Sequence, residues 1–228
     1  TDRAGNSTTY TFTIDKTAPT GTLNNVTNGG YTNKNVTFTW SEAGATATLN
    51  GSAYTSGQTI SAERRHTIVL TDRAGNSTTY TFTIDKTAPT GTLNNVNDGG
   101  YTNKDVTFTW TKTGATATLN GSAYTSGRKI SAEGAHTIVL TDRAGNSTTY
   151  TFTIDKTAPV IDAYSTYTNA EFTMTAKDKY CSIGAWEYRL DSGEIKRSQT
   201  QSLTLGGNAA YNGVWSIRVI DELGNTSN

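Results

Sequence analysis

Alternating hydroxyl and apolar side chains are the dominant pattern along this chain. Residues Thr79–Ile84 read Thr-Tyr-Thr-Phe-Thr-Ile, and residues Val36–Trp40 read Val-Thr-Phe-Thr-Trp. A pattern of period two is typical of a strand that is buried on one face only. Further strands are expected at Ala45–Leu49 and His66–Leu70, whereas no window has the periodicity of a helix. The pattern therefore predicts an all-β chain.

Turn sequences separate the expected strands. Asn50-Gly51 is a strong hairpin signal, because a type I′ turn requires positive φ at both central positions. The segment Asp72-Arg73-Ala74-Gly75 has Asp at the first and Gly at the fourth position of a type I turn. Short strands are also expected near Tyr54 and Ile60. About seven short strands with turns every 8 to 12 residues or so indicate a β-sandwich.

The stretch TDRAGNSTTYTFTIDKTAP occurs three times without change, at residues 1–19, 71–89 and 141–159. The period of seventy residues is long enough for a small domain and indicates tandem copies of one folding unit. The stretch ends in Asp-Lys-Thr-Ala-Pro, where proline fixes its own φ and favours an extended residue before it. It is interpreted as a hairpin turn, the last strand of a domain and a short, stiff joint.

The repeat divides the chain into four parts. They are the terminal strand of a preceding repeat (1–17), two copies of the unit (18–87 and 88–157) and a divergent third unit (158–228). The divergent unit is aligned through residues 217–225, which match residues 68–76. It stops after the turn, so we expect it to lack its last strand.

The two copies differ at ten of seventy positions, and all ten are assigned to turns or to outward-facing sites. The predicted core consists of unchanged apolar positions, namely Phe38, Trp40, Leu49, Ile68, Leu70 and Phe82 with their counterparts seventy residues later. In the third unit, Phe172 and Met174 are expected to replace Phe38 and Trp40. Residues Trp186, Tyr188, Trp215, Ile217 and Val219 are expected to face inward.

Charge and cysteine content exclude several classes of function. The 19 basic and 19 acidic residues give a formal net charge of zero, without the positive surface of a nucleic-acid binder or a polybasic membrane binder. No nucleic acid and no direct membrane contact are therefore expected. Cys181 is the only cysteine, so one chain cannot form a disulfide or a zinc site built from cysteines.

A family resemblance rests on the repeated stretch. The series Asp72, Ala74, Gly75 and Asn76, followed by the alternating strand and Thr87-Ala88-Pro89, resembles the bacterial immunoglobulin-like (Big-type) tandem repeats of secreted or cell-wall-attached surface proteins and adhesins. The resemblance implies small extracellular Ig-like β-sandwiches in a linear, rod-like array at the bacterial cell surface. The third unit departs from the pattern, with Glu222-Leu223 in place of Arg-Ala.

The expected function is that of a non-catalytic structural stalk or spacer in a bacterial cell-surface protein of the adhesin kind. Two alternatives stay open: the third unit binds a host glycan or protein, or the array is an accessory part of a secreted enzyme. Aromatic side chains stack well on sugars and on partner surfaces. Tyr180 and Tyr211, in expected loops of the third unit, are therefore the candidate ligand contacts.

The sequence contains no recognisable catalytic constellation. His66 and His136 occupy equivalent strand positions without a nearby nucleophile, which favours a packing role. Cys181 has no histidine in its own unit, so a Cys/His pair is not expected. No catalytic residue and no cofactor-binding residue are assigned.

Asp85, Asp155 and Asp162 are the candidate calcium ligands, because they lie near the joints, where carboxylates could gather around a hard cation. Lys86 and Lys156 directly follow two of these aspartates, and their positive charge disfavours a cation site. An isopeptide crosslink between Lys34 or Lys104 and an asparagine on a facing strand is a further option that nothing in the sequence selects.

The two ends of the chain also suggest self-association. Residues Thr9–Ile14 form a strand without a domain, and the third unit is a domain without that strand. Because an unpaired strand edge invites pairing with another chain, head-to-tail oligomers through Thr9–Ile14 are possible.

Overall fold

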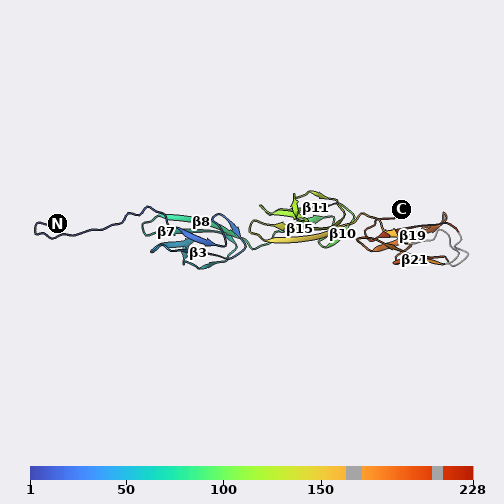
Figure 1. Cartoon of the computed structure of the whole chain (residues 1–228), viewed down its shortest axis with the longest axis horizontal. Helices are drawn as coiled ribbons and strands as arrows, with labels where there is room; N and C mark the ends of the chain where they lie inside the picture. The colour runs from blue at the N-terminus through green and yellow to red at the C-terminus, as the bar shows by residue number, and fades with distance from the viewer. Residues whose placement is uncertain (163–170, 207–212, 228) are drawn as a thin grey trace. The chain divides into compact units, whose positions relative to one another are not determined.

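The computed structural model describes residues 1–162, 171–206 and 213–227. Within these ranges the chain is all-β, and its strands gather into three tandem β-sandwiches (Figure 1). The described part contains no helix long and apolar enough to cross a membrane. The predicted fold class, tandem small β-sandwiches, is confirmed.

The first sandwich pairs a three-stranded with a five-stranded sheet. In pairing order, the smaller sheet holds β1 (Gly21–Asn24), β3 (Val36–Trp40) and β6 (Thr59–Ile60). The larger sheet holds β2 (Tyr31–Thr32), β8 (Ser77–Ile84), β7 (Arg64–Thr71), β4 (Thr46–Leu49) and β5 (Ser52–Tyr54). Every pair is antiparallel except β2 with β8, which is parallel.

The second sandwich repeats this topology. Its smaller sheet holds β9 (Gly91–Asn94), β11 (Val106–Trp110) and β14 (Lys129–Ile130). Its larger sheet holds β10 (Gly100–Thr102), β16 (Ser147–Ile154), β15 (Gly134–Thr141), β12 (Thr116–Leu119) and β13 (Ser122–Tyr124).

The third sandwich has two three-stranded sheets among the described residues. The first holds β17 (Val160–Ile161), β18 (Phe172–Lys177) and β21 (Ser202–Leu205). The second holds β20 (Lys196–Ser198), β19 (Ile183–Leu190) and β22 (Trp215–Asp221). β22 therefore takes the place that β7 and β15 have in the other two sandwiches.

The chain divides into two compact units. The first unit consists of Thr1–Ala88 with Asp142–Asn146, and the second of Pro89–Thr141 with Ser147–Asn228. The five-residue turn that follows β15 thus belongs to the first unit.

Most of the predicted core is confirmed. Phe38, Ile68, Leu70 and Phe82 are at most 1% exposed, and their counterparts are buried in the second sandwich. Trp40 and Leu49 are only partly buried and pack against this cluster. The cluster also contains residues that the sequence analysis did not assign to it, namely Val36, Ala47, Tyr54, Ile60 and Ile84.

The predicted turns are confirmed. Asn50 and Gly51 have φ of 51° and 86°, as a type I′ hairpin requires. The Gly75 amide donates to the Asp72 carbonyl at 3.3 Å, and Gly75 itself has a φ of 94°.

Strand register corrects the expected core of the third sandwich. Ile161 lies two residues after Pro159, as Gly21 does after Pro19, but Ile161 pairs with Ala176 while Gly21 pairs with Trp40. Met174 therefore takes the place of Phe38, and Phe172 takes the place of Val36. Met174 is 1% exposed and Trp186 is fully buried, whereas Phe172, Tyr188, Trp215 and Ile217 pack partly buried against the core.

The expected strand Thr9–Ile14 is not formed. Residues 7–20 carry no secondary structure, and Tyr10, Phe12 and Ile14 are 71% to 86% exposed. A β-strand needs a neighbouring strand for its backbone hydrogen bonds, and none lies beside this segment in the described structure.

Candidate functional site

The turn of the repeated stretch is built by one aspartate and one asparagine. The Asp72 carboxylate accepts the backbone N–H of Asn76 at 2.8 Å and its Nδ2 at 2.8 Å. The third sandwich shows the same bonds from Asn225 to Asp221, at 2.8 and 2.7 Å. The side-chain hydrogen bond from Asn76 is the main cause that lowers the pKa of Asp72, because it favours the charged carboxylate.

The same asparagine holds the joint that precedes its own sandwich. Asn76 Nδ2 donates to the backbone oxygen of Asp15 at 3.1 Å, and Asn146 Nδ2 donates to that of Asp85 at 2.8 Å. Asn225 Nδ2 donates to the backbone oxygen of Asp155 at 3.0 Å. The turn is therefore also a clasp for the joint. Sequence reasoning missed this role, although Asn is kept at this position even in the divergent unit.

The joints before the first and second sandwiches are held again after their prolines. The Thr78 hydroxyl donates to the Pro19 carbonyl at 2.6 Å, and the Tyr80 hydroxyl accepts the N–H of Gly21 at 2.8 Å. Equivalent bonds join Thr148 to Pro89 and Tyr150 to Gly91. In these two sandwiches, the last strand thereby fixes the segment through which the chain enters the sandwich.

Three carboxylates and one thiol meet at the joint before the third sandwich. Ligand atoms of Asp155, Asp178, Cys181 and Asp221 lie within 4.8 Å of one another, and Asp155 and Asp221 are 0% and 3% exposed. The Cys181 thiol donates to Asp155 Oδ2 at 3.2 Å, and the Thr157 amide donates to Asp155 Oδ1 at 3.1 Å.

The pKa values of Asp155 and Asp178 shift in opposite directions. Burial raises the pKa of Asp155, and the charge of Asp178 raises it further. Burial also acts to raise the pKa of Asp178, but hydrogen bonds from the backbone N–H groups of Tyr180 and Cys181 and from Asp155 lower it overall. Burial and the Asp155 carboxylate raise the pKa of the Cys181 thiol. Asp155 therefore holds a proton more readily than Asp178, and the Cys181 thiol ionises less readily than a free cysteine.

The structure does not bring the three calcium candidates together. Within the part of the chain that the structure describes, Asp155 is the only one of the three that belongs to a group of potential metal ligands. Asp162 pairs with Lys177 at 2.5 Å, and the Asp85 carboxylate accepts the Thr87 amide at 3.0 Å. Asp178, which joins Asp155, was not among the candidates, because a residue 23 positions away gives no sequence signal of proximity.

A second group of carboxylates occupies the corresponding place before the first sandwich. It consists of Asp15, Glu42 and Asp72. Carboxylate oxygens are ligands that calcium prefers, so both groups have suitable chemistry for a hard cation. The second repeat has Lys112 in the position of Glu42, so three carboxylates are not a constant feature of the repeat. Calcium binding stays a prediction.

Replacing Asp155 by asparagine is expected to raise the melting temperature at pH 7. A carboxyl group whose pKa is raised by folding contributes stability below its unfolded pKa, and this contribution is lost as pH rises through the folded pKa. The advantage of Asp155→Asn should therefore shrink as pH falls towards the usual pKa of aspartate, about 4. Thermal unfolding followed between pH 4 and 8 measures this dependence.

Asp162→Asn is the matched control, because its carboxylate is paired with Lys177 outside the cluster. It should show no such rise. The same two variants test the calcium interpretation. An ion bound in the cluster would stabilise the unsubstituted protein more than it stabilises the Asp155→Asn variant. A gain for Asp155→Asn that does not depend on pH would contradict the assignment of the raised pKa.

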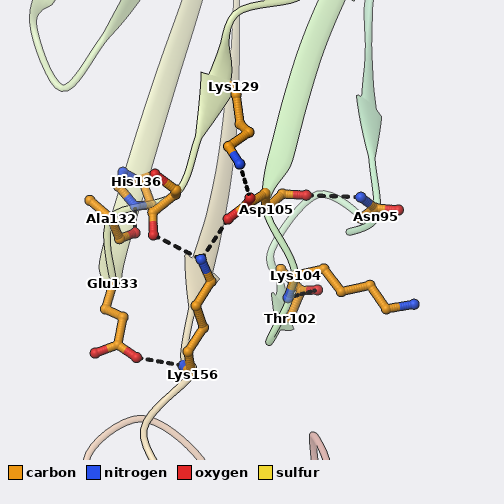
Figure 2. Close-up of polar contacts among 10 residues, drawn as sticks. Asn95, Thr102, Lys104, Asp105, Lys129, Ala132, Glu133, His136 and Lys156 are labelled. Carbon is orange, nitrogen blue, oxygen red and sulfur yellow. Dashed lines mark hydrogen bonds and ion pairs between the residues drawn. The ribbon is translucent and has the colours of Figure 1, made fainter.

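The joint lysines serve their own sandwiches. Lys156 Nζ contacts Asp105 at 2.5 Å and the Ser131 carbonyl at 3.0 Å, while Lys129 contacts Asp105 from the other side (Figure 2). In the first sandwich, Lys86 Nζ instead donates to Asn35 Oδ1 at 2.8 Å. These contacts tie the end of the last strand to neighbouring loops.

The isopeptide option gains no support from Lys104. Its side chain extends away from Asp105 and Lys156 in Figure 2. Its backbone N–H donates to Thr102, as that of Lys34 does to Thr32. Both lysines are exposed.

The histidines are structural in this geometry. His66 is 1% exposed and stacks on Phe82 with 5.1 Å between ring centroids. One ring nitrogen contacts the Ala62 carbonyl at 2.8 Å and the other contacts Asn50 Nδ2 at 3.2 Å. His136 repeats these contacts.

Two shallow hollows mark the second unit. Tyr180 lines a hollow of about 200 Å³ together with Tyr101, Cys181 and Leu223. A depression of about 260 Å³ lies over β19 and β22, with Glu187, Arg189 and Arg218 among its lining residues. Tyr211, the other candidate ligand contact, lies outside the described residues.

No protein-family model matches the chain, and no curated protein matches it. Similar solved structures include fibronectin(III)-like modules of CbhA from Clostridium thermocellum, with 14% identity, 60% of this chain and 94% of that chain covered, and a TM-score of 0.31. A 1.5-MDa bacterial ice-binding adhesin, studied for host cell surface retention, has 16% identity, 93% and 96% coverage, and a TM-score of 0.24. SGBP-B of the Bacteroides ovatus mixed-linkage glucan utilization locus, in complex with a mixed-linkage heptasaccharide, has 14% identity, 94% and 65% coverage, and a TM-score of 0.23. Because these similarities are weak, the β-sandwich fold of this chain rests on its own strand order and pairing.

Proposed function

We propose that this chain is a non-catalytic structural spacer from an extracellular bacterial surface protein of the adhesin kind. The observation that carries the proposal is the clasp, in which Asn76, Asn146 and Asn225 each bond the backbone of the joint aspartate some 60 to 70 residues earlier. A spacer needs short joints with a fixed backbone, and the clasp provides this in every copy.

The distribution of differences between the repeats supports the same proposal. The core positions Phe38, Ile68 and Phe82 recur unchanged in the second copy. Two of the differences, Asn35 to Asp105 and Thr59 to Lys129, lie at exposed or partly exposed sites. The two new residues form an ion pair with each other in the second copy. The surface changes while the interior and the joints do not, as expected when only geometry matters.

Small-angle X-ray scattering tests the spacer proposal. A compact globule of 228 residues would have a radius of gyration of about 17 Å. Tandem units of roughly 25 to 30 Å along their strands, connected by stiff joints, should instead give a clearly larger value and the distance distribution of a rod. A radius of gyration near that of a globule would reject the proposal.

A second candidate function is binding of a glycan or a host protein by the third sandwich. It is favoured by the hollow in which Tyr101 and the half-buried Tyr180 lie, because aromatic rings stack on sugars and on partner surfaces. A glycan array with the whole chain tests it, with Tyr180→Ala as the control. Absence of binding, or binding that Tyr180→Ala leaves unchanged, would exclude this role for the hollow.

A further inference from the structure

The outer face of the sheet formed by β20, β19 and β22 is charged. Trp186 of β19 is fully buried in the core of the third sandwich, and side chains alternate between the two faces of a strand. Glu187 and Arg189 therefore point away from the core. The register of the sheet places Glu187 between Arg197 of β20 and Arg218 of β22. Three arginines and one glutamate thus share this outer face.

The equivalent positions of the other two sandwiches carry no charge. They are found through the match of residues 217–225 with residues 68–76 and through the strand pairing in each sheet. All of them hold small hydroxyl or aliphatic side chains. The row Arg197, Glu187 and Arg218 corresponds to Ala53, Thr48 and Val69 in the first sandwich and to Ala123, Thr118 and Val139 in the second. The fold of this sheet therefore does not require the charges.

The positive charge of this face is only partly neutralised. Nε and Nη2 of Arg218 contact Glu187 Oε2 at 2.7 and 2.5 Å. Arg189 and Arg197 are exposed, and neither forms an ion pair with a carboxylate in the described part of the chain. Two guanidinium groups are thus in excess on this face, although the formal net charge of the whole chain is zero.

The depression over β19 and β22 gathers these groups around a small volume. It measures about 260 Å³, and Arg189, Arg218, Ser216 and Ile195 are among its lining residues. Ile195 is 55% exposed, so an apolar surface lies next to the guanidinium groups. Small-molecule sites typically measure about 300 to 1,000 Å³. The depression is slightly smaller than this range, which suits a single sugar ring.

We propose that this face binds a carboxylated polysaccharide, with Arg189 and Arg197 as the contacts for the carboxylate of a uronate unit. The two residues are diagonal neighbours on adjacent strands, since Arg197 lies opposite Glu187. Diagonal neighbours are about 7 to 8 Å apart, within reach of long side chains. A guanidinium group holds a carboxylate through two parallel N–H···O bonds. Ile195 offers its apolar side chain to the C–H groups of the sugar ring, and the Ser216 hydroxyl can bond to sugar hydroxyl groups.

A nucleic acid fits this face less well. Its affinity comes from many phosphate contacts along a broad basic surface, whereas two excess arginines match one or two anionic groups. The proposed site also lies apart from the hollow of Tyr180, because the two depressions share no lining residue. The proposal goes beyond the spacer function, and its failure would leave the scattering test of that function unaffected.

Calorimetric titration of the whole chain with oligogalacturonate tests the proposal. The methyl-esterified oligomer is the matched probe, since it has the same sugar without the charge. The acidic oligomer should bind, the ester should not, and the affinity should fall as salt screens the exposed charges. Arg189→Gln/Arg197→Gln should weaken binding at least about tenfold, because it removes charge-assisted hydrogen bonds. Both residues are exposed, so the melting temperature should not change.

Matched variants separate this face from the overall charge of the chain. Arg64→Gln/Arg65→Gln removes the same two charges from exposed positions of β7, and it should bind like the unsubstituted protein. Glu187→Gln releases Arg218 from its ion pair, so it should bind the acidic oligomer several-fold more tightly. Tyr180→Ala should leave this binding unchanged.

Three results would overturn the proposal. They are no binding of oligogalacturonate at low salt, equal binding of the methyl ester, and an equal loss of affinity in the two double arginine variants. Tighter binding of a single-stranded oligonucleotide than of oligogalacturonate would overturn the assignment of the ligand to a polysaccharide.

Discussion

Gly91→Ile is expected to destabilise the second sandwich severely, because a Cβ at Gly91 would lie 2.1 Å from Cζ of the buried Phe108 ring. The ring cannot move away without displacing its neighbours, since Phe108 is 0% exposed. Overpacking of this kind costs about 1 to 3 kcal/mol or more. For a domain of this size, each kcal/mol lowers the melting temperature by about 4 to 8 °C.

The third sandwich shows how the same space can be shared differently. Its strand register places Ile161 where Gly91 lies and Met174 where Phe108 lies. A large ring that packs against a glycine is thus exchanged for a flexible thioether in a core against which the branched Ile161 side chain packs. The double variant Gly91→Ile/Phe108→Met should therefore recover most of the stability that Gly91→Ile loses.

Urea unfolding of the two single variants and the double variant measures this coupling. Phe108→Met alone should cost less than Gly91→Ile, because methionine fills irregular space. Residues in contact typically show coupling energies of about 0.5 to 3 kcal/mol, and we expect a value at the upper end. Strictly additive effects would show that Gly91 and Phe108 do not compete for one volume.

Asn146→Ala is expected to lower the melting temperature and to loosen the joint. The variant removes two hydrogen bonds from Asn146 Nδ2, to Asp142 at 3.0 Å and to the Asp85 carbonyl at 2.8 Å. At a net value of about 0.5 to 1.5 kcal/mol for each hydrogen bond, the loss is about 1 to 3 kcal/mol. Hydrogen exchange of the backbone amides at residues 85–88 should become faster.

Asn6→Ala is the matched control for this prediction. Asn6 forms the same local bonds, from its amide and Nδ2 to the Asp2 carboxylate, at 2.9 and 2.8 Å. Its turn lies in the exposed tail without a sandwich. The control should leave the melting temperature unchanged. A similar loss in both variants would show that Asn146 acts only within its turn.

Local features of the fold could be predicted from the sequence. The hairpin at Asn50-Gly51 and the turn at Asp72–Gly75 depend on residues that are neighbours in the chain. The turn at Asp2–Asn6 forms even in the tail, which shows that it does not need a sandwich around it. Alternation alone does not make a strand, because residues 7–14 have the same sequence as β8 and carry no secondary structure in the tail.

Features that depend on distant residues could not be predicted. The parallel pairing of β2 with β8 involves a strand of two residues, Tyr31–Thr32, which is too short to show a periodicity. Trp40 was expected in the core, but it lies at the margin and donates its indole N–H to the Ala45 carbonyl. The alternation shows which face of a strand points inward, but not where the core ends.

The candidate site was only partly predictable for a similar reason. Asp155 was singled out by its place at a joint, whereas Asp178 and Asp221 reach it from two other parts of the chain. The role of Asn225 was hidden because its partner, the Asp155 carbonyl, is a backbone atom 70 residues away. A backbone partner leaves no residue type in the sequence that could reveal it.

The clasp also makes the units interchangeable. The asparagine amide recognises a backbone carbonyl, so the contact does not depend on which side chains surround the joint. The divergent third sandwich shares little of the core sequence of the first two, yet Asn225 donates the same hydrogen bond to the backbone oxygen of Asp155. Any sandwich that carries this turn could therefore follow any unit that ends in Asp-Lys-Thr-Ala-Pro, and an array could be lengthened, shortened or reordered without redesign of its connections.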